Sequence, residues 1–165
     1  MNCRLAVSAD LSSIMKLIQQ AKDFLKSNGV DQWQDGYPDE SCIDNDIRSG
    51  NGYVLTEEDR IIGYACISFD GEEAYQSLKG QWLSIQPYAV IHRMTIDNTK
   101  KGKGLAKVMF RFAEDLCKQK NVHSIKIDTD QDNAIMRHIL TRDGYQFCGD
   151  IRFQNSDKIA FEKLL

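Results

Sequence analysis

The sequence predicts a mixed α+β fold, in which one mixed sheet carries helices on both faces. Hydrophobic residues recur at helical spacing in four segments and form short alternating or continuous runs in seven others. The resulting order, β-α-α-β-β-β-α-β-α-β-β, lacks the strict alternation of a parallel α/β fold. The chain has 165 residues, 42% of them hydrophobic, and we find no repeat or Gly/Pro/Ser-rich linker. We therefore expect a single domain over residues 1–165.

The N-terminal third predicts one strand and two helices. Cys3–Val7 is the strand, and Ser8 or Asp10 can cap the helix that follows. This helix has hydrophobic residues at Leu11, Ile14, Leu17, Ile18, Ala21, Phe24 and Leu25. Asn28-Gly29 ends it. A shorter helix is expected between Pro38 and about Ser49, before the Gly50-Asn51-Gly52 turn.

The middle of the chain predicts a hairpin, an irregular segment and a central strand. Tyr53–Thr56 and Arg60–Phe69 flank the polar turn Glu57-Glu58-Asp59 and are typical of a hairpin. Residues 70–87 show no regular periodicity. Tyr88–Ile96 is an apolar strand, the fourth in the predicted order.

The C-terminal part alternates between helices and strands. An amphipathic helix runs from about Gly104 to Gln119 and is followed by the fifth strand, Val122–Asp128. A short helix over Asn133–Arg142 ends at Asp143-Gly144. Two closing strands are expected near Gln146–Phe153 and Lys158–Leu164.

The composition argues against several functional classes. The net charge of −3 does not favour a nucleic-acid or anionic-membrane partner, and no apolar run approaches the roughly 20 residues of a membrane span. Five scattered cysteines show neither metal-ligand spacing nor an even number for a disulfide framework. We therefore expect a cytoplasmic protein with reduced, buried cysteines and no metal.

The basic turn Lys101-Gly102-Lys103-Gly104-Leu105-Ala106 lies between the apolar strand and the amphipathic helix. Glycines let successive backbone N–H groups converge on one point, and a helix start adds roughly half a positive charge. These features favour binding of a pyrophosphate. The spacing fits neither a Walker loop nor the dinucleotide fingerprint, which would require a small residue at Lys107. A basic surface turn remains the alternative.

Two motifs in register resemble the GNAT superfamily of N-acetyltransferases. Lys101-x-x-Gly104-x-Ala106 is similar to the acyl-CoA signature Arg/Gln-x-x-Gly-x-Gly/Ala, with lysine as a departure at the first position. About 30 residues later, Asn133-x-x-Met136-x-x-Ile139-Leu140 and Arg142-Asp143-Gly144-Tyr145 resemble the family's second helix and next strand. The resemblance implies a GNAT-type acyl-CoA N-acyltransferase fold, with a mostly antiparallel sheet splayed between the fourth and fifth strands. Gln32-Trp33, Tyr37-Pro38 and Gly80-x-Trp82 are similar to a bacterial subgroup of small acetyltransferases.

The same resemblance implies where acetyl-CoA would bind. Pantetheine would pair with the strand backbone at Met94, Thr95 and Ile96, and the pyrophosphate would lie on the N–H groups of Lys101, Gly102, Lys103, Gly104, Leu105 and Ala106. Asn133 would hold the pantetheine arm or a nearby backbone group. Met136 and Arg142 belong to the helix that would flank the cofactor.

His92 is the candidate catalytic base. It occupies a strand position at which many GNAT relatives carry a glutamate, and imidazole suits proton transfer near neutrality. A purely structural histidine is the alternative. Arg93 should point to the opposite face of the strand and pair with an acidic residue. Leu140 stands where many relatives have a tyrosine acid, and Tyr145 is expected in the core.

Aromatic residues in the variable segments are candidates for acceptor binding. Trp33, Tyr37, Tyr75 and Trp82, together with Asp44, would suit a cationic amine, although core or dimer packing is equally expected for any one of them. The sequence thus predicts an N-acetyltransferase that transfers acetyl from acetyl-CoA to a primary amine of a small molecule or peptide by direct attack in a ternary complex. The alternative is a catalytically weak or inactive acyl-CoA-binding partner protein. The sequence leaves the oligomeric state open, with a homodimer among the alternatives.

Overall fold

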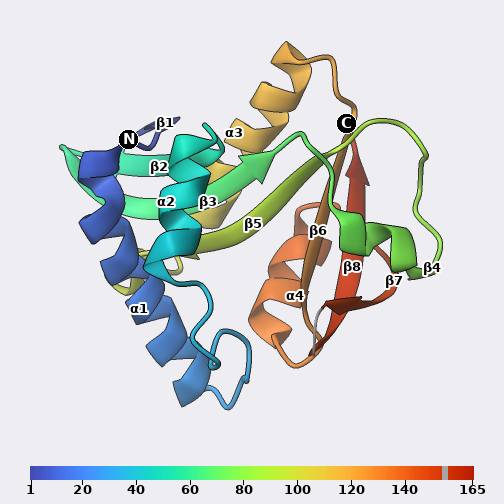
Figure 1. The fold of residues 1–165 in the computed structure, drawn as a ribbon, viewed down its shortest axis with the longest axis horizontal. Helices are drawn as coiled ribbons and strands as arrows, with labels where there is room; N and C mark the ends of the chain where they lie inside the picture. Colours follow the sequence, from blue (N-terminus) through green and yellow to red (C-terminus); the bar gives the residue numbers. More distant parts are fainter. Residues whose placement is uncertain (154–155) are drawn as a thin grey trace. The chain divides into compact units, whose positions relative to one another are not determined.

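The computed structural model describes residues 1–153 and 156–165, and its strands and helices follow one another without regular alternation (Figure 1). The strands are β1 (Asn2–Leu5), β2 (Gly52–Glu57), β3 (Arg60–Ser68), β4 (Lys79–Gly80), β5 (Ala89–Ile96), β6 (Ser124–Asp130), β7 (Gln146–Phe153) and β8 (Ser156–Leu164). The helices are α1 (Leu11–Ser27), α2 (Glu40–Arg48), α3 (Leu105–Gln119) and α4 (Ala134–Arg142), with 3₁₀ turns η1 (Ser8–Asp10), η2 (Glu73–Ser77) and η3 (Asn98–Lys100).

The strands are hydrogen-bonded in the order β1-β2-β3-β5-β6-β8-β7-β4. β5 pairs in parallel with β6 at Ala89 and Val90, whereas antiparallel pairs predominate among the other described neighbours. The predicted mixed sheet is therefore confirmed. The chain also divides into two compact units, residues 1–67 with 93–112 and residues 68–92 with 113–165, so that β5 and α3 each contribute to both.

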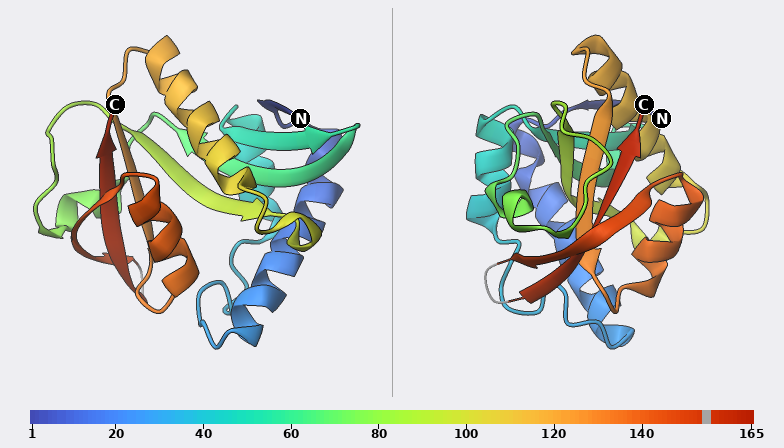
Figure 2. Two further views of the ribbon diagram at one scale, coloured as in Figure 1. Left: turned by 180° about the vertical axis from the view of Figure 1, so that it is seen from behind. Right: turned by 90° about the vertical axis from the view of Figure 1, so that its right-hand side faces the viewer.

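In the first unit, helices cover both faces of the β2–β3 hairpin (Figures 1 and 2). The buried stripe of α1 and Ile43 of α2 pack on Val54 and Tyr64, which point to one face. Tyr53 points to the other face, where its ring meets the edge of Phe112 in α3 at 5.3 Å between centroids. Because successive side chains of β2 point to opposite faces of the hairpin, each face has its own hydrophobic layer.

The second unit is built on the antiparallel strands β6, β8 and β7. β8 pairs with β6 from Ser124↔Leu164 to Asp130↔Lys158, and β4 adds a short edge beside β7. Tyr75 of η2 packs with Val90, Ile151 and Ala160 in a buried cluster. η2 is therefore held on the sheet by its aromatic side chain.

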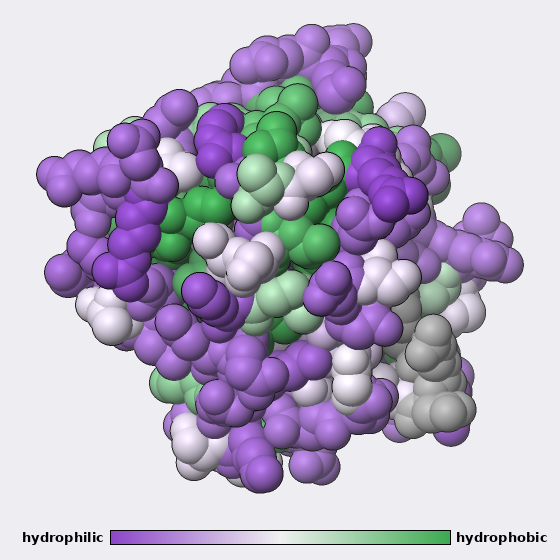
Figure 3. Space-filling view, turned by 60° about the vertical axis from the view of Figure 1, so that its left-hand side comes forward, coloured by the Kyte–Doolittle hydropathy of each residue, from purple (hydrophilic) through white to green (hydrophobic). Residues whose placement is uncertain are grey.

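Every predicted helix and strand is present, with shifts at the ends. β6 lies two residues further along the chain than predicted, and residues 70–87, predicted to be irregular, contain η2 and β4. Hydrophilic residues predominate on the face shown in Figure 3, with hydrophobic residues gathered near its middle. Among the described residues, no helix has the length and hydrophobicity needed to cross a membrane.

Candidate active site

The segment between β5 and the basic turn begins at Asp97, a buried carboxylate. It accepts hydrogen bonds from the N–H and the hydroxyl of Thr99, at 2.9 and 2.8 Å, and pairs with Arg60 at 2.8 Å. Burial raises the pKa of Asp97, but the bonds from Thr99 and the charge of Arg60 outweigh it, so that the net pKa is lowered. An ionised carboxylate thus fixes the residues that lead into the turn.

Two further contacts hold the turn against neighbouring elements. The backbone N–H of Asn98 donates to Gln20 Oε1 at 3.1 Å, and its side-chain amide donates to the carbonyl of Gln20 at 3.2 Å. Lys100 forms an ion pair with Glu57 at the end of β2. The turn is therefore tied to both α1 and the β2–β3 hairpin.

The glycines of the turn are required by backbone conformation rather than by lack of space. Gly102 and Gly104 have φ of +78° and +75°. A Cβ added at either would meet no atom of the described chain within 4 Å. Side chains of L-amino acids disfavour this region of φ, so glycine is the residue that gives this turn its shape.

The turn presents a row of backbone donors at the start of α3. Within residues 1–153 and 156–165, no hydrogen bond is donated by the N–H groups of residues 102–106, whereas Lys107 N–H closes the first turn on Gly104 at 3.1 Å. The 15-residue helix α3 adds the positive end of its dipole. This arrangement can bind a di-anionic group through the main chain.

Lys101 is exposed, but its ammonium is held against an aromatic ring. Its ammonium lies 3.1 Å from the ring centroid of Phe24 on α1. Burial lowers the pKa of Lys101 to about 8. The first residue of the turn is therefore half-desolvated and held by a cation–π contact.

Within β5, Arg93 has a left-handed backbone conformation, with a φ of +54°. The guanidinium donates to both carboxylate oxygens of Asp46 on α2, at 2.8 and 2.6 Å, and to the Tyr37 hydroxyl at 2.6 Å. Tyr64 also donates to Asp46, at 2.7 Å. The predicted pairing of Arg93 with an acidic residue is confirmed. Because Arg93 is not extended, strand alternation does not decide the face of β5 to which it points, and that part of the expectation stays a prediction.

The preceding residue, His92, pairs with a residue that the sequence did not single out. Its Nε2 lies 3.2 Å from Oε2 of Glu72, in the segment before η2. Glu72 lies in the acidic run Asp70-Gly71-Glu72-Glu73, which resembles a solvated turn and carries no periodic signal. Its proximity to β5 follows from tertiary structure alone.

The comparisons with known proteins identify the family. The profile of the acetyltransferase (GNAT) family matches residues 15–145. The chain belongs to the GNAT family. A GNAT-family acetyltransferase from Streptococcus agalactiae is 33% identical, with a TM-score of 0.90 over 99% of this chain and 95% of that protein. A GNAT-family acetyltransferase from Listeria monocytogenes is 25% identical, with a TM-score of 0.79 over 99% and 94% of the two chains.

A more distant structure shows the shared fold alone. PaiA N-acetyltransferase from Thermoplasma acidophilum, in complex with coenzyme A, is 12% identical, with a TM-score of 0.75 over 99% of this chain and 98% of that one. No curated protein sequence matches the chain. GNAT acetyltransferases are acyl-CoA-dependent N-acyltransferases that act on small-molecule or protein amines.

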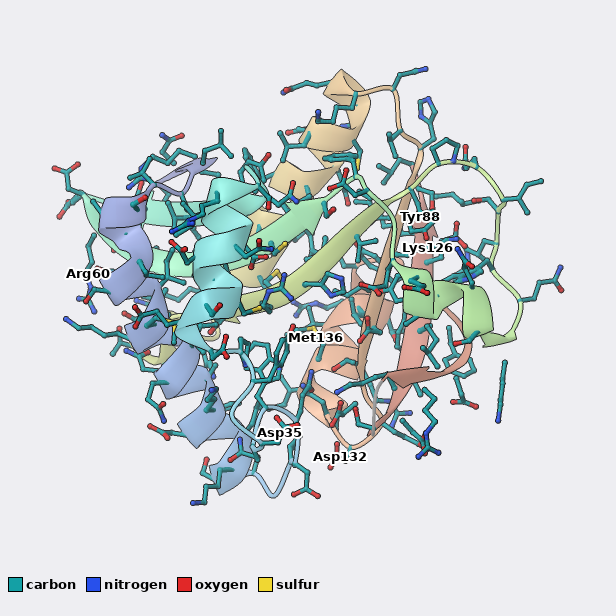
Figure 4. All side chains as sticks on the ribbon, in the orientation of Figure 1. Asp35, Arg60, Tyr88, Lys126, Asp132 and Met136 are labelled. Carbon is teal, nitrogen blue, oxygen red and sulfur yellow. The ribbon has the colours of Figure 1, made fainter. Side chains whose placement is uncertain are left out.

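The second GNAT motif lies at α4. The Asn133 side chain caps this helix, accepting from the N–H of Met136 at 3.1 Å, and so serves a nearby backbone group. Met136 is half-buried and Arg142 is exposed; Figure 4 marks the position of Met136 on α4. Leu140 is fully buried, and Tyr145 is buried as predicted, which raises its pKa well above the usual value. Contacts of this helix with a cofactor stay a prediction.

The predicted aromatic residues of this GNAT domain lie in different surroundings. Tyr75 is buried and donates to Asp128 at 2.7 Å, while the indole N–H of Trp82 donates to the Tyr75 carbonyl at 3.1 Å. The ammonium of Lys126, itself 4% exposed, lies 4.2 Å from the Trp82 ring and 3.9 Å from the Tyr88 ring (Figure 4). Packing, the alternative given for Tyr75 and Trp82, is therefore favoured: Tyr75 is buried, and the chain's own cation lies over the Trp82 ring.

The remaining aromatic candidates belong to the first unit. Trp33 packs against the core of α1 and α2. The Tyr37 hydroxyl accepts a hydrogen bond from Arg93 at 2.6 Å, while 43% of Tyr37 remains exposed. Asp44 pairs with Arg48 on the same helix. Substrate contacts of Trp33 and Tyr37 stay predictions.

Proposed function

We propose that this chain is a single GNAT domain that transfers an acetyl group from acetyl-CoA to a primary amine by direct attack in a ternary complex. The observation that carries the proposal is the row of backbone N–H groups at residues 102–106, shaped by two left-handed glycines at the start of α3. Such a row suits the pyrophosphate of coenzyme A. Family membership supplies the reaction class.

The turn and the strand before it would hold the two ends of the cofactor arm. The N–H groups of residues 102–106 would bind the pyrophosphate, and the backbone of Met94, Thr95 and Ile96 would pair with pantetheine. The N–H of Lys101, predicted to join them, instead donates to the Asn98 carbonyl at 3.4 Å. The exposed Lys103 and Lys107 would attract the anion from solution. Asn133, Met136 and Arg142 of the second motif would flank the arm.

Acetyl-CoA supplies an activated thioester; the chain's own residues supply proton transfer and charge stabilisation. The amine nitrogen forms a bond to the acetyl carbon, the carbon–sulfur bond breaks, and one amine proton is lost. His92 would accept that proton as general base. Backbone N–H groups of β5 would stabilise the developing oxyanion. Since Leu140 is apolar and fully buried, we assign protonation of the departing thiolate to solvent.

Leu140 also supports the second candidate, an acyl-CoA-binding protein with little or no catalysis. A leucine has no proton to donate where many relatives carry a tyrosine. The two candidates share the cofactor site and differ in turnover, so binding and rate must be measured separately.

The cofactor site is tested by acetyl-CoA titration calorimetry on Gly104→Ala, with Gly29→Ala as a matched control. Gly29 has a similar φ, +70°, and equally open surroundings, but lies at the end of α1. Both substitutions should lower stability by about 1–2 kcal/mol, because each forces an L-residue into the left-handed region. Only Gly104→Ala should weaken acetyl-CoA binding. Equal affinities in the two variants would refute the assigned site.

Catalysis is tested by acetyl-CoA-dependent thiol release with spermidine, an aminoglycoside, a lysine peptide and an alanine-initiated peptide. Amine-dependent release supports the acetyltransferase. Tight binding of acetyl-CoA without release from any amine would favour the second candidate.

A further inference from the structure

The pair formed by Glu72 and His92 has the geometry of a carboxylate that orients an imidazole. Nε2 of His92 and Oε2 of Glu72 are 3.2 Å apart, and the two side chains are 17% and 24% exposed. They are thus partly removed from water. A charge interaction at such a position is stronger than one on an open surface.

Glu72 is fixed at both its backbone and its second carboxylate oxygen. Its N–H donates to the Tyr88 hydroxyl at 3.4 Å, and its Oε1 accepts from Ala74 N–H at 3.3 Å, capping η2. η2 is itself anchored through Tyr75, whose hydroxyl donates to Asp128 on β6. One oxygen therefore serves the turn and the other faces the imidazole.

The contact determines which ring nitrogen can act as the base. An ionised carboxylate accepts hydrogen bonds but cannot donate, so Nε2 of neutral His92 must carry the proton. The lone pair is then on Nδ1, and Nδ1 is the atom that can take a proton from an amine. When it does, the imidazolium keeps its Nε2–H bond to Glu72, and the carboxylate balances the new charge.

We propose that Glu72 is the positioning residue for His92, holding the imidazole with hydrogen on Nε2 and Nδ1 as the acceptor of the amine proton. The proposal rests on the acetyl-transfer function above and adds to it a residue and an atom. A purely structural pair would instead tie η2 to β5, and its loss would lower stability without acting through His92.

Proton NMR tests the pair without reference to activity. The wild type should show a downfield ring N–H resonance that disappears in His92→Gln and in Glu72→Ala. Glu73→Ala is the matched control, because Glu73 is the exposed neighbouring glutamate, and it should retain the resonance. A wild type in which no such resonance depends on both Glu72 and His92 would overturn the proposal.

A double-mutant cycle on rates then tests the role. With the amine found active in the thiol-release assay, His92→Ala should lower kcat by roughly 10²-fold or more. Glu72→Gln should lower kcat by roughly 10- to 100-fold with little change in KM. In the His92→Ala background, Glu72→Gln should cost less than about twofold, since residues that act as a unit are not additive.

The possible failures are distinguishable. Additive losses in an active wild type would overturn the role of Glu72 and leave the acetyltransferase intact. A wild type that binds acetyl-CoA but acetylates none of the amines would overturn the proposed function and the catalytic role of Glu72 with it, even where the ring N–H resonance establishes the pair.

Discussion

The buried pair of Asp46 and Arg93 can be broken from one side by Asp46→Ala. The two side chains are 6% and 12% exposed, and both carboxylate oxygens are engaged. The variant leaves a buried guanidinium without its counter-charge, and it also removes the acceptor of the Tyr64 hydroxyl. Both losses fall in the first unit, next to the strained residue of β5.

The expected destabilisation follows from these contacts. Breaking a buried pair by removing one partner costs about 3–5 kcal/mol, and an orphaned buried hydroxyl costs about 1–3 kcal/mol. Release of Arg93 from its left-handed conformation returns about 1–3 kcal/mol. We therefore expect a net loss centred on about 4 kcal/mol, or about 8–16 °C in Tm for a chain of this size.

Thermal unfolding followed by circular dichroism measures the effect, with Asp44→Ala as the control. Asp44 lies on the same helix but pairs with Arg48, whose side chain is 77% exposed, so its loss should cost about 0.3–0.5 kcal/mol. Adding Arg93→Gly to Asp46→Ala should restore more stability than adding Arg93→Ala, because glycine accepts the positive φ without strain. Equal Tm values for the Asp46 and Asp44 variants would refute the reasoning.

Two further predictions concern pH and follow from shifted pKa values. The pKa of Lys101 is lowered to about 8, and a bound pyrophosphate would stabilise the protonated ammonium of this lysine. Acetyl-CoA affinity should therefore be constant below pH 8 and weaken above it. Calorimetry from pH 7 to 9.5 should show a flatter dependence of affinity on pH for Lys101→Met. The folded pKa of Asp97 lies below its unfolded value of about 3.9, so its stabilisation is present above that pH and is lost as pH falls through the folded pKa. The Tm difference between the wild type and Asp97→Asn should therefore be constant from pH 5 to 7 and shrink below pH 4; a difference that persists at pH 2 would contradict this assignment.

The parts of the site that could be predicted from sequence are those formed by residues that are contiguous in the chain. The turn at residues 101–106 is local, because its glycines, its lysines and the start of α3 are contiguous. The amphipathic helices were predicted for the same reason, since their period lies within one segment. Local pattern therefore located the candidate cofactor site.

The partners of the site were missed because they are distant in sequence. Asp46 and Arg93 are 47 positions apart, and no periodicity links an acidic residue on a helix with an arginine on a strand. As a charged residue in an acidic run, Glu72 is expected to be exposed, but in the folded chain it is half-buried. The positive φ of Arg93 was also missed, because arginine carries no sequence signal for this conformation, which depends on the surrounding contacts.

The open space around Gly102 and Gly104 bears on whether a D-amino acid can replace either glycine. Nothing in the described chain would touch an added methyl group at either position, so the barrier to alanine is one of chirality alone. D-alanine prefers the very φ values found there. Semisynthetic insertion of D-alanine should therefore preserve the turn and, by restricting the unfolded chain, stabilise the protein by about 0.4–1 kcal/mol.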